Sequence, residues 1–149
     1  MRWPRLMPPN YLLIAILAMV LLHFLLPIAR VIPYPWNLLG CALAGAGILL
    51  GLPAARLFQR AKTTIRPFEA SSALVTTGPF RLTRNPIYLG FVLILLGLAI
   101  FLGSLSPYLA VVAFAILIDR RFIRVEEQML EAKFGPAFLD FKARTRRWL

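Results

Sequence analysis

Four apolar stretches alternate with short polar segments along this chain. The first three, approximately 11–29, 38–55 and 87–103, contain no Lys, Arg, Asp or Glu. The fourth begins near residue 105 and is apolar to Ile118, and helical composition continues beyond it. A helix needs ~20 apolar residues to cross the hydrocarbon core of a bilayer. The pattern therefore predicts an all-α integral membrane protein with about four transmembrane helices, at 11–29, 38–55, 87–103 and 105–122.

Composition favours a membrane protein over a soluble domain. The 149 residues are 60% hydrophobic, whereas soluble domains are about 45–50% apolar. The chain is also basic, with 17 Lys and Arg against 6 Asp and Glu. Because the charges lie outside the apolar stretches, we interpret them as the flanks of membrane helices. Nucleic acid is therefore not an expected partner.

The positive charges predict the orientation. Few of them lie in the expected outer loops, where the first loop has only Arg30 and the turn near 103–107 has none. Cationic segments stay in the cytoplasm. We therefore expect a protein of the cell (inner) membrane with both termini and the central loop on the cytoplasmic side. The cationic residues of the central loop and the C-terminal tail are Arg56, Arg60, Lys62, Arg66, Arg81, Arg84, Arg120, Arg121, Arg124, Lys133, Lys142, Arg144, Arg146 and Arg147.

Glycine and proline residues predict helix packing and helix ends. Gly47 and Gly51 have the spacing of small residues that let two membrane helices approach closely, and Pro53 is expected to kink or end the same helix. Asn85 and Pro86 have the residue types of an N-cap and a first helical position. His23, the only histidine, is interpreted as a packing or inter-helix hydrogen-bonding residue.

The fourth helix is expected to continue into the cytoplasm. No Gly or Pro follows Ile118 until Gly135, which would end the extension, and Pro136, which would start another helix. The last segment combines aromatic and cationic side chains, which is typical of a short helix on an anionic leaflet. These side chains are Phe138, Leu139, Phe141, Arg144, Arg146, Arg147 and Trp148.

The six acidic residues lie at or beyond the expected cytoplasmic boundary, and Glu126 and Glu127 are adjacent. One interpretation is that this pair forms weak surface ion pairs, each worth about 0–1 kcal/mol. Their partners would then be Arg120, Arg121 and Arg124. The other interpretation is that the pair faces a cationic or polyhydroxylated ligand beneath the membrane. Spacing alone leaves both open.

Four ordered motifs resemble a known superfamily. They are Gly78-Pro79-Phe80-Arg81, then Arg84-Asn85-Pro86-Ile87-Tyr88-Leu89-Gly90, then Glu126-Glu127, and Phe134-Gly135-Pro136-Ala137-Phe138. In this order they resemble the isoprenylcysteine carboxyl methyltransferase and phospholipid methyltransferase superfamily of membrane-integral enzymes. The resemblance covers about residues 63–149, and the first two helices carry no such signature.

The resemblance implies methyl transfer from S-adenosylmethionine. It implies a single membrane-embedded domain, 1–149, with a cytoplasmic cofactor-binding region at about 63–90 and 119–149. Arg84, Tyr88 and Arg124 are candidate catalytic residues, and no metal is expected. The expected cofactor-binding residues are Leu74, Val75, Thr76, Arg84, Asn85, Pro86, Tyr88, Leu89, Glu126 and Glu127.

The acceptor stays open at this point. The superfamily implies a hydrophobic or lipid-linked partner in the membrane, and its reacting group can be a carboxylate, an amine or a thiol. A nicotinamide-dependent membrane reductase of related architecture is an alternative, as is a small transporter or packing subunit. The transporter is disfavoured because none of the apolar stretches holds an acid. The oligomeric state cannot be derived from these patterns.

Overall fold

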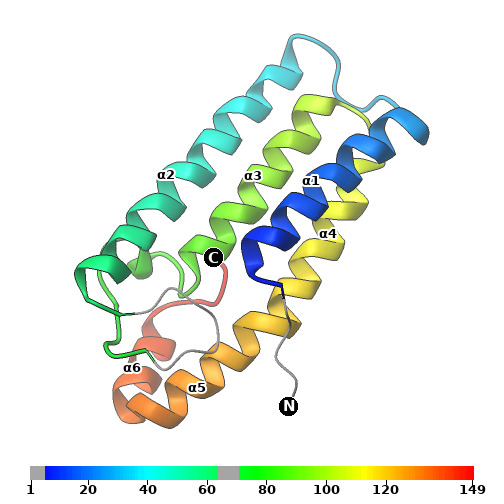
Figure 1. Ribbon diagram of the computed structural model, residues 1–149. Coiled ribbons are helices and arrows are strands. Elements are labelled where there is room, and N and C mark those ends of the chain that lie inside the picture. The colour runs from blue at the N-terminus through cyan, green and yellow to red at the C-terminus, as the bar shows by residue number, and fades with distance from the viewer. Residues whose placement is uncertain (1–5, 64–70) are drawn as a thin grey trace.

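The computed structural model (Figure 1) describes residues 6–63 and 71–149 and is all-helical. Within these ranges β pairing is limited to one isolated bridge between Arg30 and Ser104. This confirms the predicted all-α class. The elements are α1 (Pro8–Leu25), η1 (Trp36–Leu38), α2 (Leu39–Arg60), η2 (Gly78–Arg81), α3 (Pro86–Leu102), α4 (Pro107–Ile118), η3 (Asp119–Ile123), α5 (Arg124–Phe134) and α6 (Pro136–Arg144).

Helices α1 to α4 run side by side, and α5, α6 and the C-terminus gather at one end of them (Figure 1). Helix α3 is central, with α2 packed along it on one side and α1 and α4 on the other. The α1–α4 side contains a large apolar cluster that includes Met19, Leu95 and Ile118. His23 on α1 is bonded through Nδ1 to the Ser104 hydroxyl at 2.7 Å. This contact with the turn between α3 and α4 confirms the predicted inter-helix role of His23.

Glycines let α2 and α3 approach closely. A Cβ added to Gly40 would lie 2.2 Å from the Gly97 carbonyl oxygen, and one on Gly47 would lie 2.5 Å from that of Gly90. The predicted packing role of Gly47 is therefore confirmed, whereas a Cβ on Gly51 would meet its nearest neighbour only at 3.9 Å. The two helices therefore stay close from Gly47 back to Gly40, over about two turns.

Helix α2 continues through Pro53 to Arg60, so the expectation that Pro53 could end the helix is wrong. Proline is tolerated inside apolar helices because neighbouring helices and small local adjustments compensate for the lost backbone hydrogen bond. Ala54, the next residue, is fully buried. It packs in a cluster with Phe80, Phe138 and Phe141, which holds the last turns of α2 against η2 and α6.

Two helices are long and apolar enough to cross a membrane. They are α1, with 18 residues, and the 25-residue stretch Trp36–Arg60, and only 17% of the most apolar window of each is buried inside the protein. Large apolar side chains therefore point outward, among them Leu17, Phe24 and Leu49. A core helix of a soluble protein would bury most of such a window, so these helices indicate a membrane protein. Helix α3 has 17 residues and α4 has 12, so α1 and α2 are the two predicted crossings that length supports.

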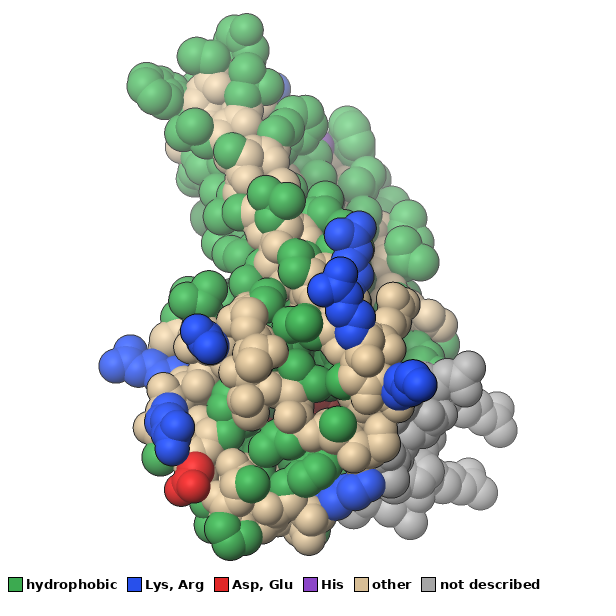
Figure 2. Space-filling view, turned by 90° about the vertical axis from the view of Figure 1, so that its left-hand side faces the viewer, with side chains coloured by type: hydrophobic (Ala, Val, Ile, Leu, Met, Phe, Trp, Pro, Cys, Tyr) green, Lys and Arg blue, Asp and Glu red, His purple; other side chains and the backbone are tan. Residues whose placement is uncertain are grey.

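Most of the charged side chains gather at one end of the molecule. Figure 2 shows hydrophobic side chains over one end and Lys and Arg side chains around the other. The charged end is formed by the last turns of α2, the start of α3, and α5 and α6. The described acids, from Asp119 to Asp140, all belong to η3, α5 and α6. The separation matches a chain with one end in an aqueous or headgroup environment.

The predicted extension of the fourth helix is confirmed, with one addition. Helix α4 passes through η3, a π-helical turn, into α5, which ends at Gly135 with φ at +48°. A π turn adds a residue to one helical turn and is frequent at functional sites. It brings Phe122 and Ile123, adjacent in sequence, both to complete burial. The wider turn therefore changes which residues of α5 face the protein.

Helix α6 does not present its phenylalanines to a membrane. Phe138 is 1% exposed and packs with Phe141, Phe80 and Ala54 in a second apolar cluster. The large apolar side chain that α6 exposes is Leu139. The sequence-based expectation of a helix lying with its aromatic face on the leaflet is therefore wrong, because α2 and η2 offer these aromatic side chains a protein surface.

The close α2–α3 contact predicts that replacement by alanine has different effects at two glycines of α2. Gly47→Ala should lower the thermal transition temperature in detergent, because the new Cβ forces the helix backbones apart, and overpacking costs about 1–3 kcal/mol. Gly45→Ala is the matched control, since nothing lies within 4 Å of a Cβ at Gly45. Equal transition temperatures for both variants would contradict the close contact.

Candidate functional site

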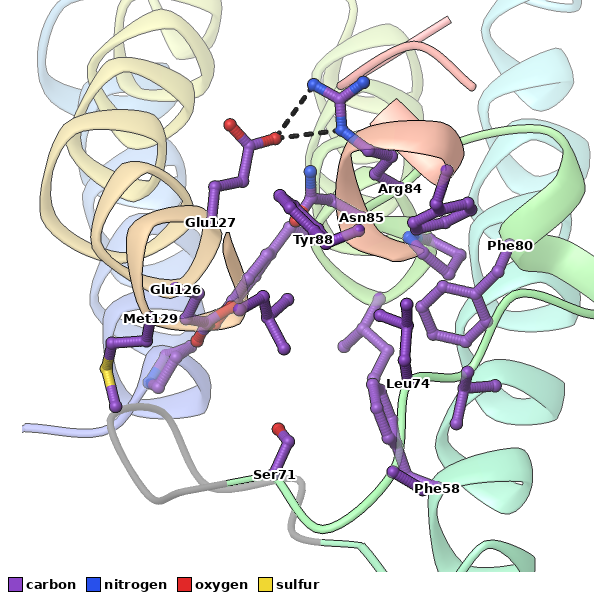
Figure 3. Close-up of a pocket in the computed structure, with 18 of the residues that line it drawn as sticks. Phe58, Ser71, Leu74, Phe80, Arg84, Asn85, Tyr88, Glu126, Glu127 and Met129 are labelled. Carbon is purple, nitrogen blue, oxygen red and sulfur yellow. Dashed lines mark hydrogen bonds and ion pairs between the residues drawn. The ribbon is translucent and has the colours of Figure 1, made fainter. Parts of the chain in front are cut away.

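A cavity of about 610 Å³ lies at the charged end of the helices (Figure 3). Its volume is in the range of small-molecule sites, about 300–1,000 Å³. The walls come from the first residues of α1, the end of α2, the segment 71–75, η2, the start of α3, α5 and α6. Most lining side chains are apolar. Among the residues that the structure describes, the charged lining ones are Arg84, Glu126, Glu127 and Lys133.

The structure brings most predicted cofactor-binding residues to this cavity. Thr76 and Leu89 are outside its lining, and Leu89 is buried against the helices. The role of the others in cofactor binding stays a prediction. The predicted residues that do line the cavity are Leu74, Val75, Arg84, Asn85, Pro86, Tyr88, Glu126 and Glu127.

Glu126 faces the cavity with one polar partner. The Tyr88 hydroxyl donates to Glu126 Oε1 at 2.7 Å, which joins the first turn of α3 to α5. Among the residues that the structure describes, no cation pairs with Glu126. A carboxylate without a cation is costly in an apolar wall. Burial raises the pKa of Glu126 to about 7, although the hydrogen bond from Tyr88 acts in the opposite direction.

Glu127 is held between two guanidinium groups. Arg84 contacts its Oε1 through Nε and Nη2, both at 3.0 Å. Arg147 contacts its Oε2 through Nε at 3.1 Å and Nη2 at 2.6 Å. The Glu127 side chain is 8% exposed and that of Arg84 is 9% exposed. Ion pairs made through two donors in so buried a place combine charge with fixed geometry. Glu127 and Arg84 therefore satisfy each other and leave little charge toward the cavity.

Arg84 also holds the end of the chain. Its Nη1 donates to the carbonyl oxygens of Thr145 and, at 3.2 Å, Lys142. Asn85 stands at the N-cap position and Pro86 is the first residue of α3, as predicted, but the Asn85 side chain does not cap the helix. Its Nδ2 instead donates to the carbonyl oxygen of Arg147 at 3.1 Å. The segment before α3 is thus bonded to the C-terminal residues.

Arg124 lies away from the cavity. Its Nε pairs with Asp119 Oδ2 at 2.9 Å, and its side chain is 58% exposed. It lines a separate hollow beside Trp148. The structure therefore does not bring Arg124 together with Arg84 and Tyr88, the other two candidate catalytic residues. The alternative in which Arg120, Arg121 and Arg124 neutralise the glutamate pair is also wrong, because Glu126 meets Tyr88, and Glu127 meets Arg84 and Arg147.

Sequence reasoning missed most of the apolar wall and two charged residues, Lys133 in the lining and Arg147 beside Glu127. Phe80 and Phe138 belong to quoted motifs, but no distinguishing pattern marks the other apolar wall residues. Arg147 was grouped with the C-terminal cations, and no local signal separates it from Arg144 or Arg146. The apolar wall residues that were missed include Phe58, Phe80, Phe91, Met129, Leu130, Phe138 and Phe141.

The arrangement suits a ligand that carries both signs of charge. After Arg84 and Glu127 neutralise each other, the cavity retains Glu126 and Lys133, seven residues apart on α5. That spacing is about 10 Å along a helix. A small molecule with a cationic group and a separate carboxylate can meet both side chains, while the apolar wall accepts its uncharged parts.

Comparison with known proteins agrees with this picture. The family model described as "Phospholipid methyltransferase" matches residues 36–137. An uncharacterized protein of Haemophilus influenzae is 40% identical over 63 residues, which are 42% of this chain and all of that protein. No solved structure matches. The description of the matching family indicates methyl transfer to lipid-like substrates. Since the match covers more than half of the chain, the protein belongs to the phospholipid methyltransferase family.

Proposed function

We propose that the protein transfers a methyl group from S-adenosylmethionine to a hydrophobic or lipid-linked acceptor at the cytoplasmic face of the cell membrane. The observation that carries this proposal is Glu126, an acid without a cationic partner among the described residues, in the wall of an apolar cavity. Membership of the family supports methyl transfer to a lipid-like substrate. The donor, the acceptor and the membrane face are our inference.

The charges of the cavity fit this donor. S-adenosylmethionine supplies a methyl group on a positively charged sulfonium, together with an ammonium group, a carboxylate and ribose hydroxyls. Glu126 can pair with a cationic group or accept from hydroxyls, and Lys133 can pair with a carboxylate. Arg84 is not available for the ligand's carboxylate, because its guanidinium is already bonded to Glu127 and to two carbonyl oxygens.

The protein contributes orientation and protection from water. Methyl transfer from a sulfonium is a direct displacement, and good alignment can supply about 7–11 kcal/mol. Tyr88 holds the Glu126 carboxylate at one position through its hydroxyl. Phe80, Phe138 and the other aromatic side chains of the wall exclude water and offer flat surfaces for an aromatic base.

Position in the molecule supports a lipid-linked acceptor. The cavity lies at the cationic end of the helices and also borders Met7, Pro8 and Pro9 at the start of α1 and Phe91 on α3. An apolar tail can therefore approach from the membrane side of the site. We infer that α3 and the α4–η3 helix also cross the bilayer, which gives four crossings and places both termini at the cytoplasmic face.

Substitution of Glu126 tests the donor site. We expect Glu126→Gln to weaken S-adenosylmethionine binding at least tenfold, about 1.4 kcal/mol, because the amide cannot neutralise a cation. The measurement is calorimetric titration of detergent-purified protein. Glu131→Gln is the matched control on α5, since Glu131 is paired with Lys142 and lies outside the cavity lining. Equal affinities of both variants and the unmodified protein would contradict the assignment.

The affinity should rise with pH near neutrality. A carboxyl with its pKa near 7 is about one-tenth ionised at pH 6 and half ionised at pH 7, so pairing with a cation should strengthen about fivefold over this interval. Binding then releases a proton. The ligand's own amino group has a pKa of about 7.7–8.0 and stays charged in this range. Glu126→Gln, titrated at the same pH values, should show no such rise.

The reaction itself is tested by incorporation of a radiolabelled methyl group. Purified protein in vesicles of defined phospholipids should transfer label from S-adenosylmethionine into the lipid-extractable fraction, and Glu126→Gln should reduce the rate at least tenfold. A parallel titration with a nicotinamide dinucleotide distinguishes the reductase alternative. Binding of the dinucleotide without binding of S-adenosylmethionine would overturn the proposed function.

A further inference from the structure

The last five residues, Thr145–Leu149, form what we call the C-terminal strap. This segment follows α6 and returns to the start of α3 (Figure 1). Its backbone carbonyl groups accept hydrogen bonds from the segment before α3: the Arg84 backbone amide donates to Arg146 at 2.9 Å, and the Thr83 hydroxyl donates to Arg147 at 3.0 Å. The strap is therefore attached to the start of α3 through its backbone.

The side chain of Arg147 extends from the strap to two other elements. Besides its contacts with Glu127 of α5, its Nη1 lies 3.4 Å from Asp119 Oδ1, at the first residue of η3. Arg147 therefore contacts both the first residue of the π turn and the helix that follows it. Trp148, the next residue, packs against the apolar cluster that contains Phe122. One residue of the strap thus joins the start of α3, the π turn and α5.

The position of α5 depends on this connection. Glu127 accepts from both guanidinium groups, Arg84 at Oε1 and Arg147 at Oε2. If Arg147 is removed, Arg84 still neutralises the charge of Glu127, but Oε2 loses both of its donors in a buried place, which favours movement of that oxygen toward water. Because Glu126 and Glu127 are adjacent on one helix, rotation of α5 that exposes Glu127 also moves Glu126 away from Tyr88. The π turn is the place where α5 can rotate relative to α4.

We propose that Arg147 is a positioning residue, through which the C-terminal strap holds α5 so that Glu126 faces the cavity and meets Tyr88. The inference rests on the proposed donor site for its functional consequence. It goes beyond the family assignment, because the family match ends at residue 137 and does not include the strap. Arg147 need not contact the ligand, and its own side chain is outside the cavity lining.

The test compares three variants of the full-length protein. Arg147→Ala should weaken S-adenosylmethionine binding at least fivefold, and the fivefold rise in affinity from pH 6 to pH 7 should disappear, because a solvated Glu126 is ionised at both pH values. Arg147→Lys should be intermediate, since lysine keeps the charge but not the two-donor geometry. Arg144→Ala is the control, because the Arg144 side chain is exposed at the end of α6. It should bind as the unmodified protein does.

A ligand-free measurement separates this proposal from the proposed function. Hydrogen–deuterium exchange of the α5 amides should be faster in Arg147→Ala than in the unmodified protein and unchanged in Arg144→Ala. If the unmodified protein does not bind S-adenosylmethionine, the proposed donor is wrong, while the exchange result still tests the strap. If Arg147→Ala and Arg147→Lys keep the affinity, the pH dependence and slow exchange, the positioning role is wrong. Should Arg147→Ala fail to fold, Arg147→Lys alone decides.

Discussion

The buried carboxylate of Glu127 is the interaction on which the site depends. It lies between Arg84, at the start of α3, and Arg147, near the end of the chain, so one acid joins segments 43 and 20 residues away from it. Breaking a buried ion pair costs about 3–5 kcal/mol, and the side chains of Arg84 and Glu127 are both less than 10% exposed. Arg147 supplies the donors to the second oxygen of Glu127. These contacts keep α3, α5 and the C-terminal strap in one arrangement, and that arrangement forms the wall of the cavity.

The two adjacent glutamates have different roles because their surroundings differ. Within the described part of the chain, Glu127 has four hydrogen bonds or ion-pair contacts from two arginines, whereas Glu126 has one hydrogen bond from Tyr88. The satisfied acid maintains the structure, and the other can respond to a ligand. The raised pKa of Glu126 has the same origin, since desolvation without a cation favours the neutral acid. The acid that we propose to bind the ligand thus lies next to a rigidly held one.

The apolar part of the molecule gives this site its place at a membrane. Close contact of α2 and α3 at Gly40, Gly47, Gly90 and Gly97 leaves the other face of α2, and most of α1, directed outward as apolar surface. The charged residues and the cavity lie together at one end of these helices (Figures 2 and 3). A site in this position can receive a polar donor from water and an apolar acceptor from the bilayer, as the lipid-like substrates of the family require.

Local sequence determined the elements, whereas tertiary contacts decided the site. Uninterrupted apolar runs predict helices because length and hydropathy are properties of each segment, and Asn85-Pro86 and Gly135-Pro136 mark boundaries through their own backbone preferences. The sequence does not predict which of Glu126 and Glu127 points into the cavity. Adjacent helical residues point about 100° apart, and the π turn at Asp119–Ile123 changes the direction in which each side chain of α5 points. The partner of Glu127 could not be predicted either. Arg147 differs from Arg144 and Arg146 only in where the folded chain returns its backbone to the start of α3, and burial of the resulting ion pairs is a property of the folded protein.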